Sequence, residues 1–155
     1  MAAAPLAAQA ASEGTGLPLP RFVSLKAQRV NVRSGPSNDH AVKWIFVRSG
    51  LPVEVVQEFE NWRRIRDSEG DEGWVYWSLL SGKRTALVAP WGGGEPVLLH
   101  QSPDDKSRIT ATLDPRVVVG IESCDGKWCR VTGKGFKGYA PQGDLWGVYP
   151  DETVK

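Results

Sequence analysis

Val30-Asn31-Val32-Arg33-Ser34-Gly35-Pro36 is the stretch that decides the fold of this chain. Its pattern returns 67 residues later as Val97-Leu98-Leu99-His100-Gln101-Ser102-Pro103. In both copies an alternating apolar run leads into a polar turn that ends at proline. A pattern that recurs at such a spacing indicates one structural unit used twice.

Two further markers repeat in the same order. Asn61-Trp62-Arg63-Arg64-Ile65 corresponds to Lys127-Trp128-Cys129-Arg130-Val131 at an offset of 66, and Gly73-Trp74-Val75 corresponds to Gly138-Tyr139-Ala140 at an offset of 65. A chain of 155 residues has room for two units of roughly 60 residues. The sequence therefore predicts two small domains in tandem. Domains of this size are marginally stable alone, so mutual packing or a covalent link is expected.

Both units consist of short runs in which apolar and polar residues alternate, as in half-buried strands. Turn signals rich in glycine, proline, aspartate and serine separate the runs, and no long helical period appears. About five short strands per unit favour a small barrel over a sandwich. The prediction is all-β, with two tandem small β-barrels. The predicted boundaries are a flexible lead or signal remnant at 1–20, barrels at 21–82 and 94–149, a linker at 83–93 that contains Pro90 and two glycines, and a tail at 150–155.

Charge and apolar patterning limit the functional classes. The net charge is +1, and neither unit has an excess of lysine and arginine, so the basic stripe typical of nucleic-acid binding is missing. No apolar run approaches the roughly 20 residues that a membrane span requires. Ala8-Gln9-Ala10 fits a signal-peptide cleavage pattern, although the positive and apolar parts of a signal are not visible. We expect a periplasmic or secreted protein.

The string Asn31-Val32-Arg33-Ser34-Gly35-Pro36-Ser37 resembles the opening signature of bacterial Src-homology-3-like domains. Gly50-Leu51-Pro52-Val53-Glu54-Val55, Asn61-Trp62 and Gly73-Trp74-Val75 follow as in that family, and the resemblance covers roughly residues 21–149. It is similar to the exported tandem type of Gram-negative bacteria. The resemblance implies small β-barrels that bind peptides or cell-wall material, usually without catalysis. The second unit departs from the signature, because His100-Gln101-Ser102-Pro103 replaces Arg33-Ser34-Gly35-Pro36.

Cys124 and Cys129 flank Asp125-Gly126-Lys127-Trp128, in which Asp-Gly is a tight-turn signal between strands. The two sulfurs can face each other across a hairpin, where a disulfide stabilises by about 2 kcal/mol. Two free thiols in a cytosolic protein are the alternative. The C-x4-C spacing disfavours a zinc or redox site.

Aromatic residues are the candidate ligand contacts. Positions that match Trp62 and Tyr76 help to form the peptide groove in eukaryotic relatives, so the resemblance implies both as contacts. Trp77 lies beside them, Trp44 is a candidate for completing a wall, and polar loop groups such as Asn31, Asn38 and Asp39 are candidates for orienting the ligand. Flat rings suit prolyl or sugar ligands. The alternative is that these rings pack the two barrels together.

The second unit offers weaker candidates. Trp128 and Pro141 are the counterparts of Trp62 and Tyr76, and we expect Trp91 and Trp146 to cover the junction between the barrels. Glu69, Asp71 and Glu72 fit a solvated hairpin loop rather than a calcium loop. We expect Arg63, Arg64 and Arg66 either to meet these acids or to contact an anionic ligand.

Catalysis is not expected. His40 and His100 are the only histidines, and neither follows a nucleophile motif. An enzyme that uses Cys124 or Cys129 with His100 is a remote alternative. The leading hypothesis is a binding module for a peptide, peptidoglycan or an envelope protein, with no cofactor and no metal. The competing hypothesis is a structural scaffold of the envelope.

Overall fold

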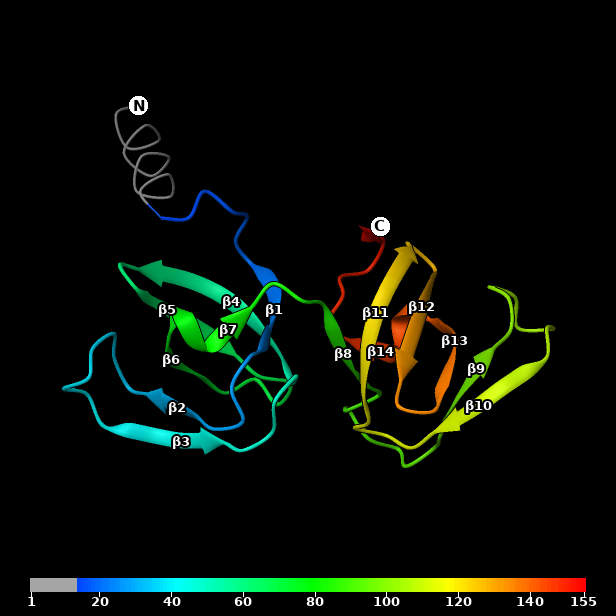
Figure 1. Ribbon diagram of the computed structural model, residues 1–155, viewed down its shortest axis with the longest axis horizontal. Coiled ribbons are helices and arrows are strands. Elements are labelled where there is room, and N and C mark those ends of the chain that lie inside the picture. Colours follow the sequence, from blue (N-terminus) through cyan, green and yellow to red (C-terminus); the bar gives the residue numbers. More distant parts are fainter. Residues whose placement is uncertain (1–13) are drawn as a thin grey trace.

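The computed structural model describes residues 14–155, which form two β-barrels side by side (Figure 1). The predicted signal pattern at Ala8-Gln9-Ala10 lies outside the described residues. Within residues 14–155 there is no α-helix, and no helix there is long and apolar enough to span a membrane.

The first barrel is a seven-stranded antiparallel sheet with the strand order β3-β2-β6-β5-β4-β1-β7. A short 3-10 turn, η1 (Trp77–Leu79), links its last two strands. Its strands are β1 (Arg21–Leu25), β2 (Val30–Arg33), β3 (Val42–Phe46), β4 (Pro52–Phe59), β5 (Trp62–Arg66), β6 (Glu72–Tyr76) and β7 (Leu80–Ser81).

The second barrel repeats this arrangement with the order β10-β9-β13-β12-β11-β8-β14. The 3-10 turn η2 (Gln142–Asp144) corresponds to η1. The strands are β8 (Thr85–Val88), β9 (Val97–His100), β10 (Ile109–Leu113), β11 (Val118–Asp125), β12 (Trp128–Gly133), β13 (Phe136–Pro141), β14 (Leu145–Trp146) and β15 (Thr153–Val154). The two orders match strand for strand, so the duplication predicted from the sequence is confirmed.

Each barrel has its own hydrophobic core, because alternate residues of every strand point inward. Val30, Val32, Val53 and Ile65 are fully buried in the first core. A separate cluster that includes Leu99, Val119 and Val131 fills the second. Two distinct cores are what a tandem of small barrels requires.

Two predicted boundaries need correction. The segment 83–93 was expected to be a linker, but all four residues of β8 are buried, and Thr85, Ala86 and Leu87 pair with β11. β8 occupies the place in the second barrel that β1 occupies in the first, so the repeat begins earlier than its sequence markers. The tail at 150–155 is also partly structured, because β15 pairs with Cys124 and Asp125.

The predicted disulfide is confirmed. Cys124 and Cys129 are paired residues of the β11–β12 hairpin, and their sulfurs are bonded. Both residues are buried in the second core. The disulfide therefore joins two neighbouring strands just below the tight turn that the Asp-Gly signal predicted.

The junction between the barrels has a small aromatic core. The ring of Phe22 lies 5.1 Å from Trp146 and 4.5 Å from Tyr149, measured between ring centroids. Thr85 Oγ1 donates a hydrogen bond of 2.7 Å to the carbonyl oxygen of Gly50. Trp146 therefore covers the junction as expected, whereas Trp91 is 58% exposed.

Candidate functional site

The outward face of β4, β5 and β6 carries the predicted aromatic residues. Arg63 pairs with the core residue Val75, and paired residues lie on the same face of the sheet. Because successive residues of a strand point to opposite faces, Trp62 lies on the outward face. The strand register then places Phe59, Trp62 and Tyr76 directly opposite one another on three neighbouring strands. Side chains paired in this way contact each other across the sheet.

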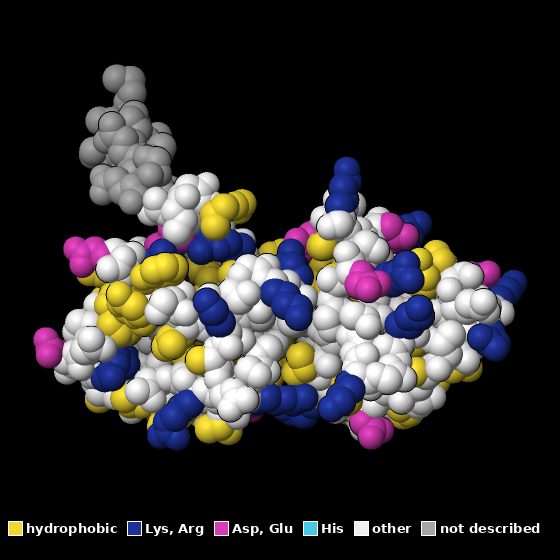
Figure 2. All heavy atoms as spheres, in the orientation of Figure 1, with side chains coloured by type: hydrophobic (Ala, Val, Ile, Leu, Met, Phe, Trp, Pro, Cys, Tyr) yellow, Lys and Arg dark blue, Asp and Glu magenta, His cyan; other side chains and the backbone are white. Residues whose placement is uncertain are grey.

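Three exposed aromatic residues and one buried one come together at this end of the sheet: Phe59 and Tyr76 pair with Trp62, and Trp77 follows Tyr76 in the chain. Phe59 is 49% exposed, Tyr76 37% and Trp77 51%, whereas Trp62 is only 8% exposed. We call Phe59, Tyr76 and Trp77 the aromatic patch. Figure 2 shows hydrophobic side chains gathered on the first barrel around this end of the β4–β5 hairpin.

Trp62 supports the patch from below. Its ring meets Tyr76 edge to face, with 5.4 Å between the centroids. The sequence predicted Trp62 as a leading ligand contact, and its burial corrects this, because little of the ring is left for direct contact. Trp62 instead fixes the position of Tyr76.

Trp77 is held by the backbone. Trp77 is the first residue of η1, and its backbone N–H donates a hydrogen bond of 2.9 Å to the carbonyl oxygen of Asn61. This bond connects η1 to the turn of the β4–β5 hairpin. The backbone of Trp77 is thus fixed beside the turn that precedes Trp62, and its indole is exposed. An aromatic side chain has few rotatable bonds, so it loses little conformational entropy when a ligand covers it.

Phe59 was missed by the sequence interpretation. It ends β4 and pairs with Trp62 across the two-residue turn Glu60-Asn61. Glu60 has a φ of 50°, as tight hairpin turns often require. The short spacing between Phe59 and Trp62 was the signal that could have placed the two rings together.

The remaining predicted contacts lie elsewhere. Trp44 pairs with the core residue Val32, packs against Phe46 with 5.7 Å between centroids, and faces the first core rather than the patch. Asn31 is half-buried on β2, which neighbours β6 in the sheet. Asn38 and Asp39 are exposed in the loop before β3. The structure therefore brings Trp62, Tyr76 and Trp77 together, leaves Asn31 on the adjacent strand, and sets Trp44 apart.

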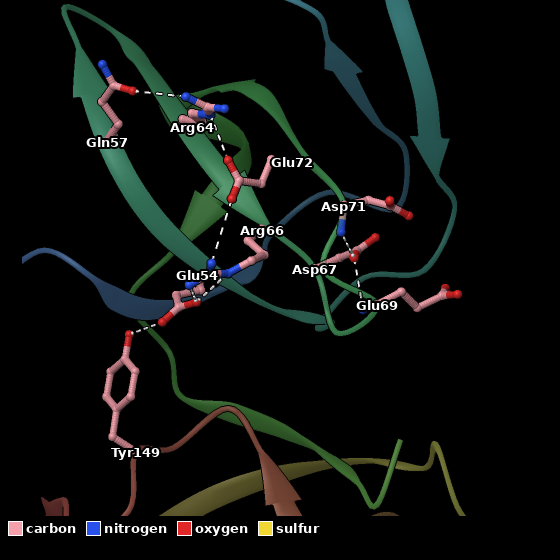
Figure 3. A network of polar contacts seen from close by, with 9 residues as sticks. All are labelled: Glu54, Gln57, Arg64, Arg66, Asp67, Glu69, Asp71, Glu72 and Tyr149. Carbon is pink, nitrogen blue, oxygen red and sulfur yellow. Dashed lines mark hydrogen bonds and ion pairs between the residues drawn. The ribbon is translucent and has the colours of Figure 1, made fainter. Parts of the chain in front are cut away.

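A charged network covers the outward face beside the patch (Figure 3). Glu72 lies between two arginines, with Nε of Arg64 at 2.9 Å and Nη1 of Arg66 at 3.7 Å from its carboxylate oxygens. Arg66 also donates two hydrogen bonds, of 2.6 and 2.9 Å, to Oε1 of Glu54. Arg64 and Arg66 thus meet acids across the strands, which was one of the two expected roles.

The network reaches the second barrel through Tyr149. Its hydroxyl donates a hydrogen bond of 2.7 Å to Oε2 of Glu54, and Figure 3 shows the side chain extending toward β4. Burial, together with this hydrogen bond to Glu54, raises the pKa of Tyr149 well above its ordinary value. A buried charged acceptor and a neutral donor therefore fix the two barrels to each other.

The acidic hairpin loop is self-contained. The Asp67 carboxylate accepts hydrogen bonds of 3.0 Å from the backbone N–H groups of Glu69 and Asp71. Burial raises the pKa of Asp67. Across residues 14–155 no group of three or more histidine, cysteine or acidic side chains could hold a metal ion.

Within residues 14–155 the structure pairs neither Cys124 nor Cys129 with a histidine. Cys124 and Cys129 are consumed in the disulfide, so neither is available as a thiolate. His40 lies in the first barrel, where Nδ1 is 2.8 Å from the hydroxyl of Ser37. His100 is buried in the second barrel and lies edge-on to the half-buried Trp128 at 5.8 Å. Trp128 pairs with Pro141 in the sheet, as the correspondence with Trp62 and Tyr76 predicted.

Comparison with known proteins agrees with this fold. The sequence model of the bacterial SH3 domain matches residues 26–82 and again residues 93–147. No curated protein matches the chain.

Solved structures of low sequence identity resemble the chain. NlpC2 from Trichomonas vaginalis is 14% identical with a TM-score of 0.37, and the alignment covers 84% of this chain and 49% of that one. An NlpC/P60 family protein from Bacillus cereus ATCC 10987 is 12% identical with a TM-score of 0.36, over 81% of this chain and 55% of that one. The chain thus spans about half the length of these proteins.

Proposed function

The chain belongs to the bacterial SH3 domain family, with two copies of the domain in series, and from this premise we propose that it is an exported protein that binds a peptide or the peptide part of peptidoglycan through the aromatic patch of its first barrel. The bacterial SH3 family is a family of non-catalytic binding domains. The disulfide fits an oxidising compartment outside the cytoplasm. We place the protein in the periplasm or outside the cell.

The observation that carries the proposal is the exposure of Phe59 and Tyr76 on either side of the buried Trp62, together with that of Trp77, whose backbone is bonded to Asn61 next to Trp62. The junction between the barrels uses other rings, namely Phe22, Trp146 and Tyr149. The aromatic patch is therefore not the set of rings that packs the two barrels together, which was the alternative role for these residues. Neighbouring exposed aromatics of this kind are typical of surfaces that bind an outside partner.

In the proposed mechanism an extended ligand lies across the patch and buries the faces of Tyr76 and Trp77. Prolyl or alanyl groups of a peptide fit between flat rings at a low entropic cost. Asn31, on the strand next to β6, supplies a polar contact that orients the ligand backbone. An envelope protein that presents an extended segment would use the same surface.

Calorimetric titration with peptidoglycan fragments tests the proposal. Tyr76→Ala combined with Trp77→Ala is expected to weaken binding at least tenfold, because the two rings supply most of the apolar contact. Ile109→Ala is the matched control, since Ile109 is 50% exposed on the second barrel and lies outside the patch. Equal affinities of the double variant and the wild type would refute the proposal.

A further inference from the structure

A pocket of about 390 Å³ opens on the second barrel, and the proposed function does not use it. Its wall comes from the segment that precedes β9, from the strand β9 itself, from the last residue of β13 and from the end of η2. This volume lies within the range of small-molecule sites. The lining residues are Ala89, Trp91–Gly93, Glu95–Leu98, His100, Pro141 and Asp144.

His100 contributes a hydrogen-bond acceptor to this pocket. The side chain is only 7% exposed, and its Nδ1 lies 3.1 Å from the carbonyl oxygen of Ser107. A carbonyl oxygen only accepts, so Nδ1 carries the hydrogen, and in the neutral ring Nε2 is left as an acceptor. Within residues 14–155, Nε2 of His100 has no hydrogen-bond partner. This atom is not fully enclosed by the protein, so a ligand in the pocket can reach it.

Two carboxylates add negative charge. Asp144 is half-buried, and its carboxylate forms no hydrogen bond or ion pair with any described residue. Burial alone raises the pKa of Asp144, which reflects the cost of a charge that has no compensating partner. Glu95 is exposed at the rim. No lysine or arginine lines the pocket to balance either group.

Trp91 completes the wall. Its ring is 58% exposed and lies just before Gly92, Gly93 and Gly94, which all have a positive φ. An exposed indole face attracts a cation that lies over it. Two side-chain N–H groups line the pocket, the indole N–H of Trp91 and the Nδ1–H of His100, and the latter is already bonded to Ser107; the other side-chain polar groups are acceptors.

These groups complement a ligand that carries positive charge and several hydrogen-bond donors. His100, Asp144 and Glu95 are not arranged to hold a metal ion, because no such group of three exists within residues 14–155. A primary ammonium has three N–H donors on one charged nitrogen, and it is larger and less demanding in geometry than a metal. We propose that this pocket binds the primary ammonium group of a small organic ligand, through Asp144, Glu95, Nε2 of His100 and the face of Trp91.

Calorimetry with paired probes tests the assignment. The probes are trialanine and N-acetyl-trialanine, together with glucosamine and N-acetylglucosamine. At least one free amine is expected to bind, and its acetylated counterpart at least tenfold more weakly, because acetylation removes the charge and two donors. The amine that binds identifies the source as a peptide terminus or an amino sugar. If neither free amine binds, or if acetylation makes no difference, the proposal is wrong.

Variants assign the binding to this pocket. Asp144→Asn is expected to weaken binding of the free amine at least tenfold, and Glu95→Gln serves as a second variant at an exposed position in case the first fails to fold. Asp105→Asn is the matched control, since Asp105 is exposed on the same barrel and does not line the pocket. Amine binding that Asp144→Asn and Glu95→Gln leave unchanged would overturn the assignment. Asp144 and Glu95 lie on the second barrel, whereas Tyr76 and Trp77 lie on the first. Loss of amine binding in the Asp144 and Glu95 variants can therefore be distinguished from loss of peptidoglycan binding in the Tyr76 and Trp77 variant.

Discussion

Trp62→Ala is expected to lower the free energy of unfolding of the first barrel by about 3 kcal/mol or more, the usual cost of removing a large buried aromatic side chain. The ring is 8% exposed and packs edge-on against Tyr76. Its removal leaves a cavity beneath the aromatic patch and frees Tyr76 to move. Urea unfolding followed by circular dichroism measures the loss without relying on tryptophan emission.

Trp77→Ala is the matched control for this prediction. Trp77 is a tryptophan of the same barrel but is 51% exposed, so its loss is expected to cost less than about 1 kcal/mol. If Trp62→Ala proves as mild as this control, Trp62 is not a packing residue. Trp62 would then again be interpreted as a direct ligand contact.

Tyr149→Phe is expected to lower the free energy of unfolding by about 1.5 kcal/mol near neutral pH, the low end for a hydrogen bond to a charged group. The variant keeps the ring that packs on Phe22 and removes only the hydroxyl that donates to Glu54. Glu54 retains both of its hydrogen bonds from Arg66, which limits the loss. Tyr139→Phe is the control, since no side-chain hydrogen bond is found for the Tyr139 hydroxyl among the described residues.

The effect of Tyr149→Phe is also expected to depend on pH. The pKa of Tyr149 is higher in the folded protein than its ordinary value near 10, so the folded state favours the protonated phenol. This contribution to stability is complete below about pH 10 and is lost as the pH rises toward the folded pKa. The gap between wild type and variant is therefore expected to narrow by up to about 1.4 kcal/mol at about pH 11. A gap that stays constant or widens between pH 8 and pH 11 would contradict the contact with Glu54.

Local patterns were sufficient to predict the repeat and most of the strands. Alternation in Val30–Val32 and Trp62–Ile65 identified β2 and β5, because the period of two is a property of the strand itself. The Asp-Gly turn between Cys124 and Cys129 likewise identified the hairpin and its disulfide. In each case the interacting residues are close in sequence.

Features that depend on pairing between distant residues could not be predicted in this way. β8 was hidden because Thr85–Val88 has no alternation, being buried on both faces, and it borders a segment rich in glycine and proline. The burial of Trp62 depends on its neighbours on β4 and β6, and the contact of Tyr149 with Glu54 joins residues 95 positions apart. Such contacts follow from the closure of each barrel and from the docking of one barrel on the other.

The central claim is that the aromatic patch of the first barrel meets a ligand from outside the chain. The seven tryptophans give resolvable indole N–H signals in a ¹H–¹⁵N correlation spectrum, which can be recorded while solubilised peptidoglycan fragments are added. We predict that the indole signal of Trp77 shifts most and that of Trp62 follows, while Trp128 and Trp146 in the second barrel stay in place. An unmoved Trp77 signal at saturating fragment, whether or not other indoles respond, would contradict the account.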